Sequence, residues 1–374
     1  MTIRSFIEAL PKVDLNVQFE GSLPRDFLLL LRDQNDIPTS MKSVRQYNEL
    51  MAQLDKADPK RIYEFVGRFA RWIQYPEDLT RAVYEVGLAL YKQNVRYAEV
   101  QISPSIYIAN GIAFETFLNA INDGRDRVWR AWQVKMNWIL SIPRDDPRSG
   151  DEVARWAVSA TAKRGNVVGL GVNSIRINRE VAKKSAVSPV RRGASTVSPT
   201  LSDDDIQPVG QFVRPFTTAQ KKELATVATA HNHPKVESLP EILKALSPNR
   251  LHEVGEGLSD EVQFQALKEQ KAICVVTPTR EWRLGKVETL NAFPYRALME
   301  AVPMCLSASM PTFYRTTLNE EYALAVEQGG LSTEEIEQIA LNSVSSSFLS
   351  DEDKHSLLDS FKSAYASLRA EHLS

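Results

Sequence analysis

The sequence is poor in the residues that mark specialised classes of protein. Only two of its 374 residues are cysteine, Cys274 and Cys305, and neither belongs to a Cys-x-x-Cys pair. This excludes a disulfide framework and indicates a reducing compartment. No run approaches the roughly 18 apolar residues of a membrane span, and the first twelve residues lack the apolar core of a secretory signal. We therefore expect a cytoplasmic protein.

Charge of one sign is not in excess either. The chain has 45 lysines and arginines against 47 aspartates and glutamates, for a net charge of -2. Such a balance gives no electrostatic footprint for nucleic acid or for an anionic membrane, so we expect neither as a partner. What remains is ordinary for a globular protein, with 43% hydrophobic and 25% charged residues.

Short β-branched runs alternate along the chain with longer segments of helical periodicity. This alternation is typical of a parallel βα architecture. The sequence therefore predicts an α/β fold, a single (β/α)₈ TIM barrel with extra helices after the first strand and at the C-terminus. Residues at the carboxyl ends of the strands would form its functional face. The predicted strands are residues 12–19, 96–102, 135–142, 166–172, 224–230, 250–254, 272–276 and 303–308.

One segment, residues 176–207, does not fit this pattern. It is rich in Ser, Thr and Pro, basic in its first half, and acidic at Asp203, Asp204 and Asp205. Because it has few large apolar residues to bury, we predict a flexible surface insertion within a barrel that spans residues 1–374. We favour a tolerated insertion, and a partner-binding or regulatory loop is the alternative.

Several runs resemble one known family in the order in which they occur. LPKVDLNVQFEGSL at 10–23 and VRYAEVQISP at 95–104 are similar to the first two strands of adenosine deaminases. Further matching runs are TPT at 277–279, LG at 284–285, PTF at 311–313, LNEEY at 318–322, LNSV at 341–344 and SFL at 347–349. The chain is identified as a member of this family of metal-dependent hydrolase barrels.

The resemblance also implies where the family binds its zinc ion. Its members use a His-x-His pair on the first strand, a histidine at the end of the fifth and an aspartate on the eighth. The matching positions in this chain are Asn16, Gln18, Thr229 and Ser309. Neutral amides and hydroxyls are poor zinc ligands beside imidazole or carboxylate. We therefore expect no metal and no other cofactor.

The family's remaining functional positions differ as well. Its proton-shuttling glutamate corresponds to Asn232, its water-activating histidine to Glu253, and a second aspartate to Met310. The glycine whose amide meets the purine ring corresponds to about Ser174. Zinc lowers the pKa of bound water from 15.7 to about 7, and a chain without ligands would lose this effect. These positions predict a metal-free pseudoenzyme, with no catalytic residue, that binds a nucleoside-like small molecule or a protein partner.

Three alternatives remain open at this point. His231, His233 and His252 lie near Glu253 in the sequence, so a relocated metal site is conceivable. The polar residues at the strand ends form either a hydrogen-bonding pocket for a nucleoside-sized ligand or a site that drifted after catalysis was lost. Bulky side chains fill the old site in a third interpretation, namely Arg280, Glu281 and Trp282. The competing functions are an active purine nucleoside (adenosine) deaminase and an enzyme with new metal-free chemistry on the same barrel.

Overall fold

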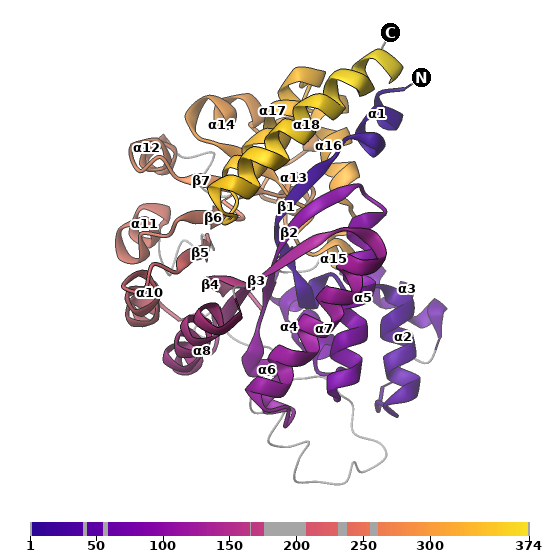
Figure 1. The fold of residues 1–374 in the computed structure, drawn as a ribbon, viewed down its shortest axis with the longest axis vertical. Coiled ribbons are helices and arrows are strands. Elements are labelled where there is room, and N and C mark those ends of the chain that lie inside the picture. The colour runs from indigo at the N-terminus through magenta and orange to yellow at the C-terminus, as the bar shows by residue number, and fades with distance from the viewer. Residues whose placement is uncertain are drawn as a thin grey trace.

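Eight parallel strands form one sheet, and their order in the sheet is their order in the sequence (Figure 1). The computed structural model describes residues 2–39, 43–54, 59–164, 166–175, 207–230, 238–254 and 261–372. Every predicted strand is found, with ends within two residues of the predicted ones. The strands are β1 (Lys12–Gln18), β2 (Val95–Ile102), β3 (Lys135–Pro143), β4 (Val167–Asn173), β5 (Ala225–Thr229), β6 (Arg250–His252), β7 (Ile273–Val276) and β8 (Met304–Leu306).

The first and last strands meet and bring the sheet round into a barrel. The backbone N–H of Gln18 donates to the carbonyl of Ser309 at 3.0 Å. The hydroxyl of Ser307 donates to the carbonyl of Asn16 at 3.2 Å. These bonds place the carboxyl end of β1 beside the residues that follow β8, so the predicted TIM barrel is confirmed.

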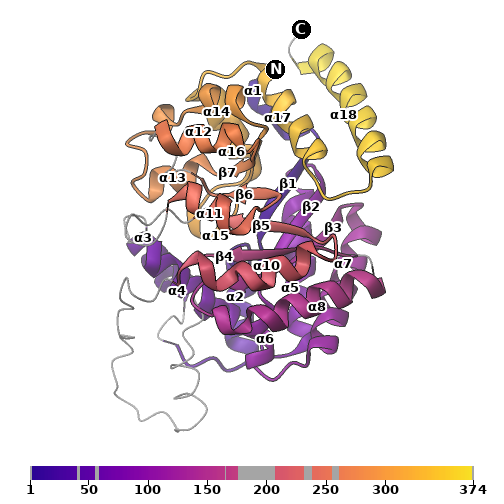
Figure 2. The same cartoon turned by 90° about the vertical axis from the view of Figure 1, so that its left-hand side faces the viewer.

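Helices surround the sheet, and most of them connect one strand to the next (Figure 2). The predicted extra helices after β1 are α2 (Arg25–Gln34), α3 (Val44–Gln53) and α4 (Pro59–Ala70), before the connecting helix α5 (Pro76–Tyr91). The other connections contain α6 (Pro104–Ala109), α7 (Phe114–Trp132), α8 (Gly150–Arg164), α10 (Val213–Gln220), α11 (Leu239–Leu246), α12 (Glu261–Glu269), α13 (Pro278–Arg283) and α14 (Tyr295–Ala301). None of the helices in the described part of the chain is long and apolar enough to cross a membrane.

The C-terminal helices return the chain to its beginning. They are α15 (Pro311–Tyr314), α16 (Leu318–Glu327), α17 (Thr333–Ser345) and α18 (Asp351–His372), and the chain starts with α1 (Ile3–Ala9). Figure 1 shows both ends of the chain side by side, where Ser5 Oγ lies 3.1 Å from His372 Nδ1. The start of α17 is a capping box in which Ser332 and Glu335 satisfy each other's backbone N–H groups.

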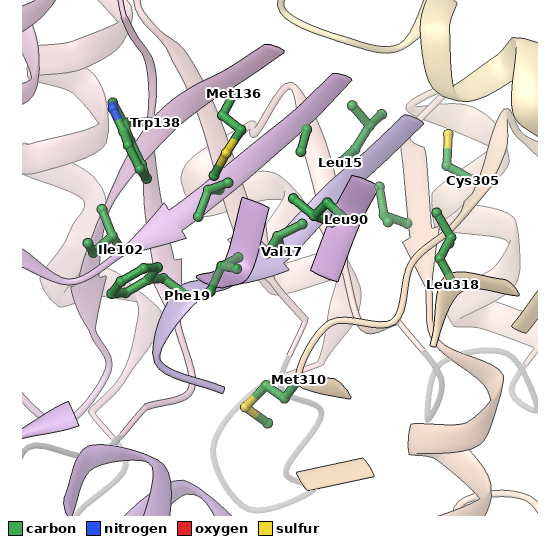
Figure 3. Close-up of a cluster of buried hydrophobic side chains, with 14 of the residues drawn as sticks. Leu15, Val17, Phe19, Leu90, Ile102, Met136, Trp138, Cys305, Met310 and Leu318 are labelled. Atoms are coloured by element: carbon green, nitrogen blue, oxygen red, sulfur yellow. The ribbon is translucent and has the colours of Figure 1, made fainter. Parts of the chain in front are cut away.

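Strand β1 shows how alternation sorts its side chains between the two faces of the barrel. Successive side chains of a strand point to opposite faces. Leu15 and Val17 belong to the hydrophobic core, which Figure 3 shows around this strand. Asn16 and Gln18 lie on the other face and bond to each other at 3.0 Å. The polar residues at the ends of the strands are thus held inside the barrel.

The predicted insertion at 176–207 lies outside the described residues except for its last residue. The carbonyl of Gln207 accepts a bond of 3.4 Å from Arg144 Nε, on the segment that follows β3. The prediction of a flexible segment therefore stays a prediction, as does a single unit spanning the whole chain.

A buried carboxyl group on α16 makes stability depend on pH. Burial raises the pKa of Glu321 from 4.5 to about 7, although Thr279 N at 3.1 Å and Thr316 Oγ1 at 2.5 Å both donate to it. A raised carboxyl pKa favours the protonated folded state. Its contribution to stability is complete below the unfolded pKa and is lost as the pH rises through about 7.

We predict that Glu321→Gln removes this pH dependence. The difference in the free energy of unfolding, variant minus wild type, should increase by about 3 kcal/mol as the pH rises from 4.5 to 8. Denaturant unfolding at several pH values measures the difference. Glu320→Gln, which removes an exposed carboxylate from the same helix, controls for the change in net charge. A constant difference between Glu321→Gln and the wild type would contradict the prediction.

Candidate active site at the carboxyl ends of the strands

Most of the residues singled out from the sequence lie at one end of the barrel. Asn16 and Gln18 are on β1 and Thr229 is on β5, while Glu253 directly follows β6 and Ser309 is the third residue after β8. Ser174 follows β4, and all six side chains are less than 9% exposed. Asn232, together with His231 and His233, lies outside the described residues.

Glu253 and Ser309 are joined directly across this end of the barrel. Ser309 Oγ donates to Glu253 Oε1 at 2.7 Å. Both residues have a left-handed backbone, with φ of 58° at Glu253 and 54° at Ser309. A side chain other than glycine in this region costs roughly 1 kcal/mol or more, and such strain concentrates at functional sites. The local structure thus holds the carboxylate of Glu253 in a fixed position.

Arg280 on α13 completes a buried charged cluster around Glu253. Its Nε lies 3.2 Å from Glu253 Oε2, its Nη1 donates to Glu281 Oε1 at 2.6 Å, and its Nη2 donates to Tyr63 Oη at 3.0 Å. Burial opposes the charge of Arg280, but Glu253 and Glu281 more than offset this and raise its pKa. Tyr63 comes from α4, so the extra helices after β1 cover this end of the barrel.

The structure separates the three bulky side chains that the sequence suggested as filling the site. Arg280 and Glu281 are buried at this end, where they form an ion pair. Trp282 is 41% exposed and points out of the site, because the next position on the helix faces another direction. Met310 belongs to the hydrophobic core (Figure 3). It packs against Gly21, where an added Cβ would meet its Cγ at 2.2 Å.

Several buried polar atoms at this end have no partner among the described residues. They include Thr229 Oγ1, Ser174 Oγ, Thr277 Oγ1 and one amide atom each of Asn16 and Gln18. Leaving a buried polar atom unsatisfied costs about 1–3 kcal/mol. Such atoms are able to bond to water or to a ligand, and in this fold the strand ends are where ligands bind.

Glu20 is a member of this group that the sequence did not single out. Its carboxylate follows β1, accepts from Ser103 N at 2.8 Å, and is fully buried. Burial raises its pKa to about 7, and its Oε2 has no partner in the part of the chain that is described. The signal available in the sequence was an acidic residue directly after the first predicted strand.

The described residues do not fit a zinc ion. They contain no group of three or more His, Cys, Asp or Glu side chains that is able to hold a metal. His252 is buried in the barrel, but its two ring nitrogens face Arg250 Nε at 3.1 Å and Gln101 Nε2 at 2.8 Å. The relocated metal site that the sequence left open therefore has no free nitrogen from His252.

We predict that Arg280→Met destabilises the fold strongly. It would leave Glu253 and Glu281 buried without their counter-charge, which costs about 3–5 kcal/mol. Denaturant unfolding measures the loss. The control is Arg45→Met, which breaks an exposed ion pair with Glu49 at 2.7 Å. This substitution should lower the free energy of unfolding by less than about 1 kcal/mol. Equal effects of the two substitutions would show that the buried cluster does not hold this end together.

Comparisons with known proteins agree with the fold. The family model described as adenosine deaminase matches residues 11–187 and 176–364. An adenine deaminase from Rhodospirillum rubrum is 24% identical over 92% of this chain and 94% of its own length. An aminodeoxyfutalosine deaminase from Streptomyces avermitilis is 27% identical over 93% of this chain and 89% of its own.

Solved structures share the fold at lower identity. An adenine deaminase from Arthrobacter aurescens has a TM-score of 0.78 at 20% identity, covering 95% of this chain and 98% of its own. An amidohydrolase from Burkholderia ambifaria with bound Zn has a TM-score of 0.80 at 18% identity, covering 99% and 95%.

These findings correct two expectations drawn from the sequence. The relatives are named as deaminases and one neighbouring structure contains zinc, so the predicted pseudoenzyme and the predicted absence of a cofactor are both wrong. The expectation equated the loss of individual ligand types with the loss of activity. Residues 231–237, which include Asn232, lie outside the described residues. The match to the family model covers most of the sequence, and the chain belongs to the adenosine deaminase family.

Proposed function

We propose that this protein is a deaminase of an amino-substituted purine and acts at the carboxyl end of its barrel. The observation that carries the proposal is the set of unsatisfied buried polar atoms on Asn16, Gln18, Ser174 and Thr229. They lie where barrel enzymes bind their substrates. Membership in a family whose relatives are named as deaminases supports the reaction type.

The chemistry of these atoms favours a neutral heterocycle as the substrate. Amides and hydroxyls supply both donors and acceptors, but no net charge. Two buried cations lie at this end: Arg280 is already paired with Glu253 and Glu281, and Arg144, which directly follows β3, donates to the carbonyl of Gln207. A purine edge that carries an amino group beside a ring nitrogen matches such a mixed set.

Hydrolytic deamination replaces a ring amino group by an oxygen from water and releases ammonia. It needs a group that accepts a proton from water and returns one to the leaving nitrogen. Glu253 is the carboxylate that Ser309 and Arg280 hold in place, so we assign the proton transfer to it. Zinc supplies an activated water when it is bound in a metal-dependent hydrolase. Since the described residues do not fit zinc, every step assigned here belongs to the side chains alone.

A cytoplasmic location is part of the proposal. It is supported by the two cysteines, Cys274 and Cys305, which are both buried and free of disulfides.

We predict that the purified protein releases ammonia from adenine or adenosine. Glu253→Gln should lower the rate by at least about 100-fold, because proton transfer by a positioned side chain contributes about 10²–10⁴-fold. The matched control is Glu281→Gln, which removes the other carboxylate paired with Arg280 and should retain most of the activity. The rate is measured with added zinc and after treatment with a chelator.

The outcome that would contradict the proposal is the absence of ammonia from both compounds under both metal conditions. An equal loss in Glu253→Gln and Glu281→Gln would instead show that Glu253 acts only through the charged cluster.

A further inference from the structure

A chain of polar side chains crosses the barrel interior and ends at the proposed substrate site. It begins at Arg250 and His252 on β6, continues through Gln101 on β2, and reaches Asn16 and Gln18 on β1. All five side chains are at most 3% exposed. Bulk water does not reach these side chains, so where two of them meet, a donor must face an acceptor.

Arg250 is fixed from several directions at the start of this chain. It is ion-paired with Glu99, and it donates to the carbonyl of Ser346 at 3.0 Å and to the carbonyl of Leu15 at 3.2 Å. The ring of Phe348 lies 4.2 Å from its guanidinium carbon. With these contacts made, its Nε–H points to His252 Nε2 at 3.1 Å.

Arg250 determines which ring nitrogen of His252 carries the proton. A guanidinium has only donors, so His252 Nε2 must accept. Burial, together with the charge of Arg250, lowers the pKa of His252 well below its usual value, and the ring is neutral. A neutral imidazole has one N–H, which is therefore at Nδ1.

The proton on Nδ1 then sets the orientation of Gln101. Nδ1 lies 2.8 Å from the terminal amide atom of Gln101, which must be an acceptor. With Gln101 Nε2 in this place, two donors would face each other. A half turn of the amide, which keeps its shape, puts Oε1 there. It also directs Nε2 to the hydroxyl of Ser141, 2.9 Å away, which accepts as well as it donates.

The requirement that each donor face an acceptor also sets the orientations of the two amides on β1. The amide atom of Asn16 at 2.7 Å from Gln101 must now be its NH₂ group. That NH₂ group lies 3.0 Å from a terminal atom of Gln18, which must be the oxygen. The atoms left without a protein partner are then the oxygen of Asn16 and the NH₂ group of Gln18.

We propose that Arg250 is a positioning residue that sets the hydrogen-bonding polarity of the site, making Asn16 an acceptor and Gln18 a donor toward the substrate. This pair fits a ligand edge on which an N–H donor adjoins an unprotonated ring nitrogen, as in an aminopurine. The assignment of the ligand rests on the proposed function, whereas the order of donors and acceptors rests on the contacts alone.

The first experiment measures the tautomer of His252 by ¹⁵N NMR of the full-length protein. The ring signals of His252 are identified by their absence in His252→Gln. We expect a protonated Nδ1 and an unprotonated Nε2. A proton on Nε2 would overturn the proposal.

The second experiment removes the control that Arg250 exerts. Arg250→Lys keeps a cation beside Glu99 but places a methylene where Arg250 has its Nε–H. We expect a mixture of His252 tautomers and adenine binding that is weaker by about tenfold in calorimetry, the effect of one lost hydrogen bond. Phe348→Leu is the control, since it removes the ring contact of Arg250 and leaves the bond to His252. It should change neither the tautomer nor the affinity.

Gln101→Leu is the second variant, in case Arg250→Lys does not fold. It interrupts the chain beyond His252, so the Nδ1 proton should stay while adenine binding weakens. A single tautomer and full affinity in Arg250→Lys, or full affinity in Gln101→Leu, would overturn the proposal. If the wild type shows the predicted tautomer but binds no adenine, the order of donors and acceptors is supported and the proposed function fails.

Discussion

The ion pair of Arg250 and Glu99 inside the barrel is the interaction on which the polar arrangement above it depends. Both side chains are fully buried, and removing two charges from water is costly unless every remaining donor and acceptor is satisfied. Glu99 Oε1 accepts hydrogen bonds from Phe348 N at 2.6 Å and from Tyr97 Oη at 3.0 Å. The barrel thus encloses an ion pair, and contacts from β2, β6 and the C-terminal segment offset the cost of burying it.

A second buried guanidinium, that of Arg280, organises the opposite end. It binds Glu253 and Glu281 and reaches Tyr63 on α4. The helices after β1 are therefore joined to the site by polar contacts, in addition to apolar packing such as that of Phe69 on Phe313. The two clusters act on different parts of the site. The cluster around Arg250 orders the amides on β1, and the cluster around Arg280 holds the carboxylate of Glu253 after β6.

The site shows why a residue-by-residue reading of a family pattern has limits. Asn16, Gln18 and Thr229 were correctly placed at one end of the barrel, yet the inference from their identities to an inactive protein was wrong. Side-chain type limits what an isolated residue does, but the chemistry of a site depends on the groups assembled around it. Glu253 illustrates this, since the position of its carboxylate depends on Ser309 and Arg280 rather than on its place in the sequence.

The sequence by itself determined the eight strands, their parallel order and the face on which each polar residue lies. These features depend on local periodicity: Leu15 and Val17 alternate with Asn16 and Gln18, and a strand turns alternate side chains to opposite faces. Only the tertiary structure decided the partners. Tyr63 and Arg280 are 217 positions apart, and Gln101 and His252 are 151 apart. Their bonds require atoms within about 3 Å and correct donor direction, which no local pattern specifies.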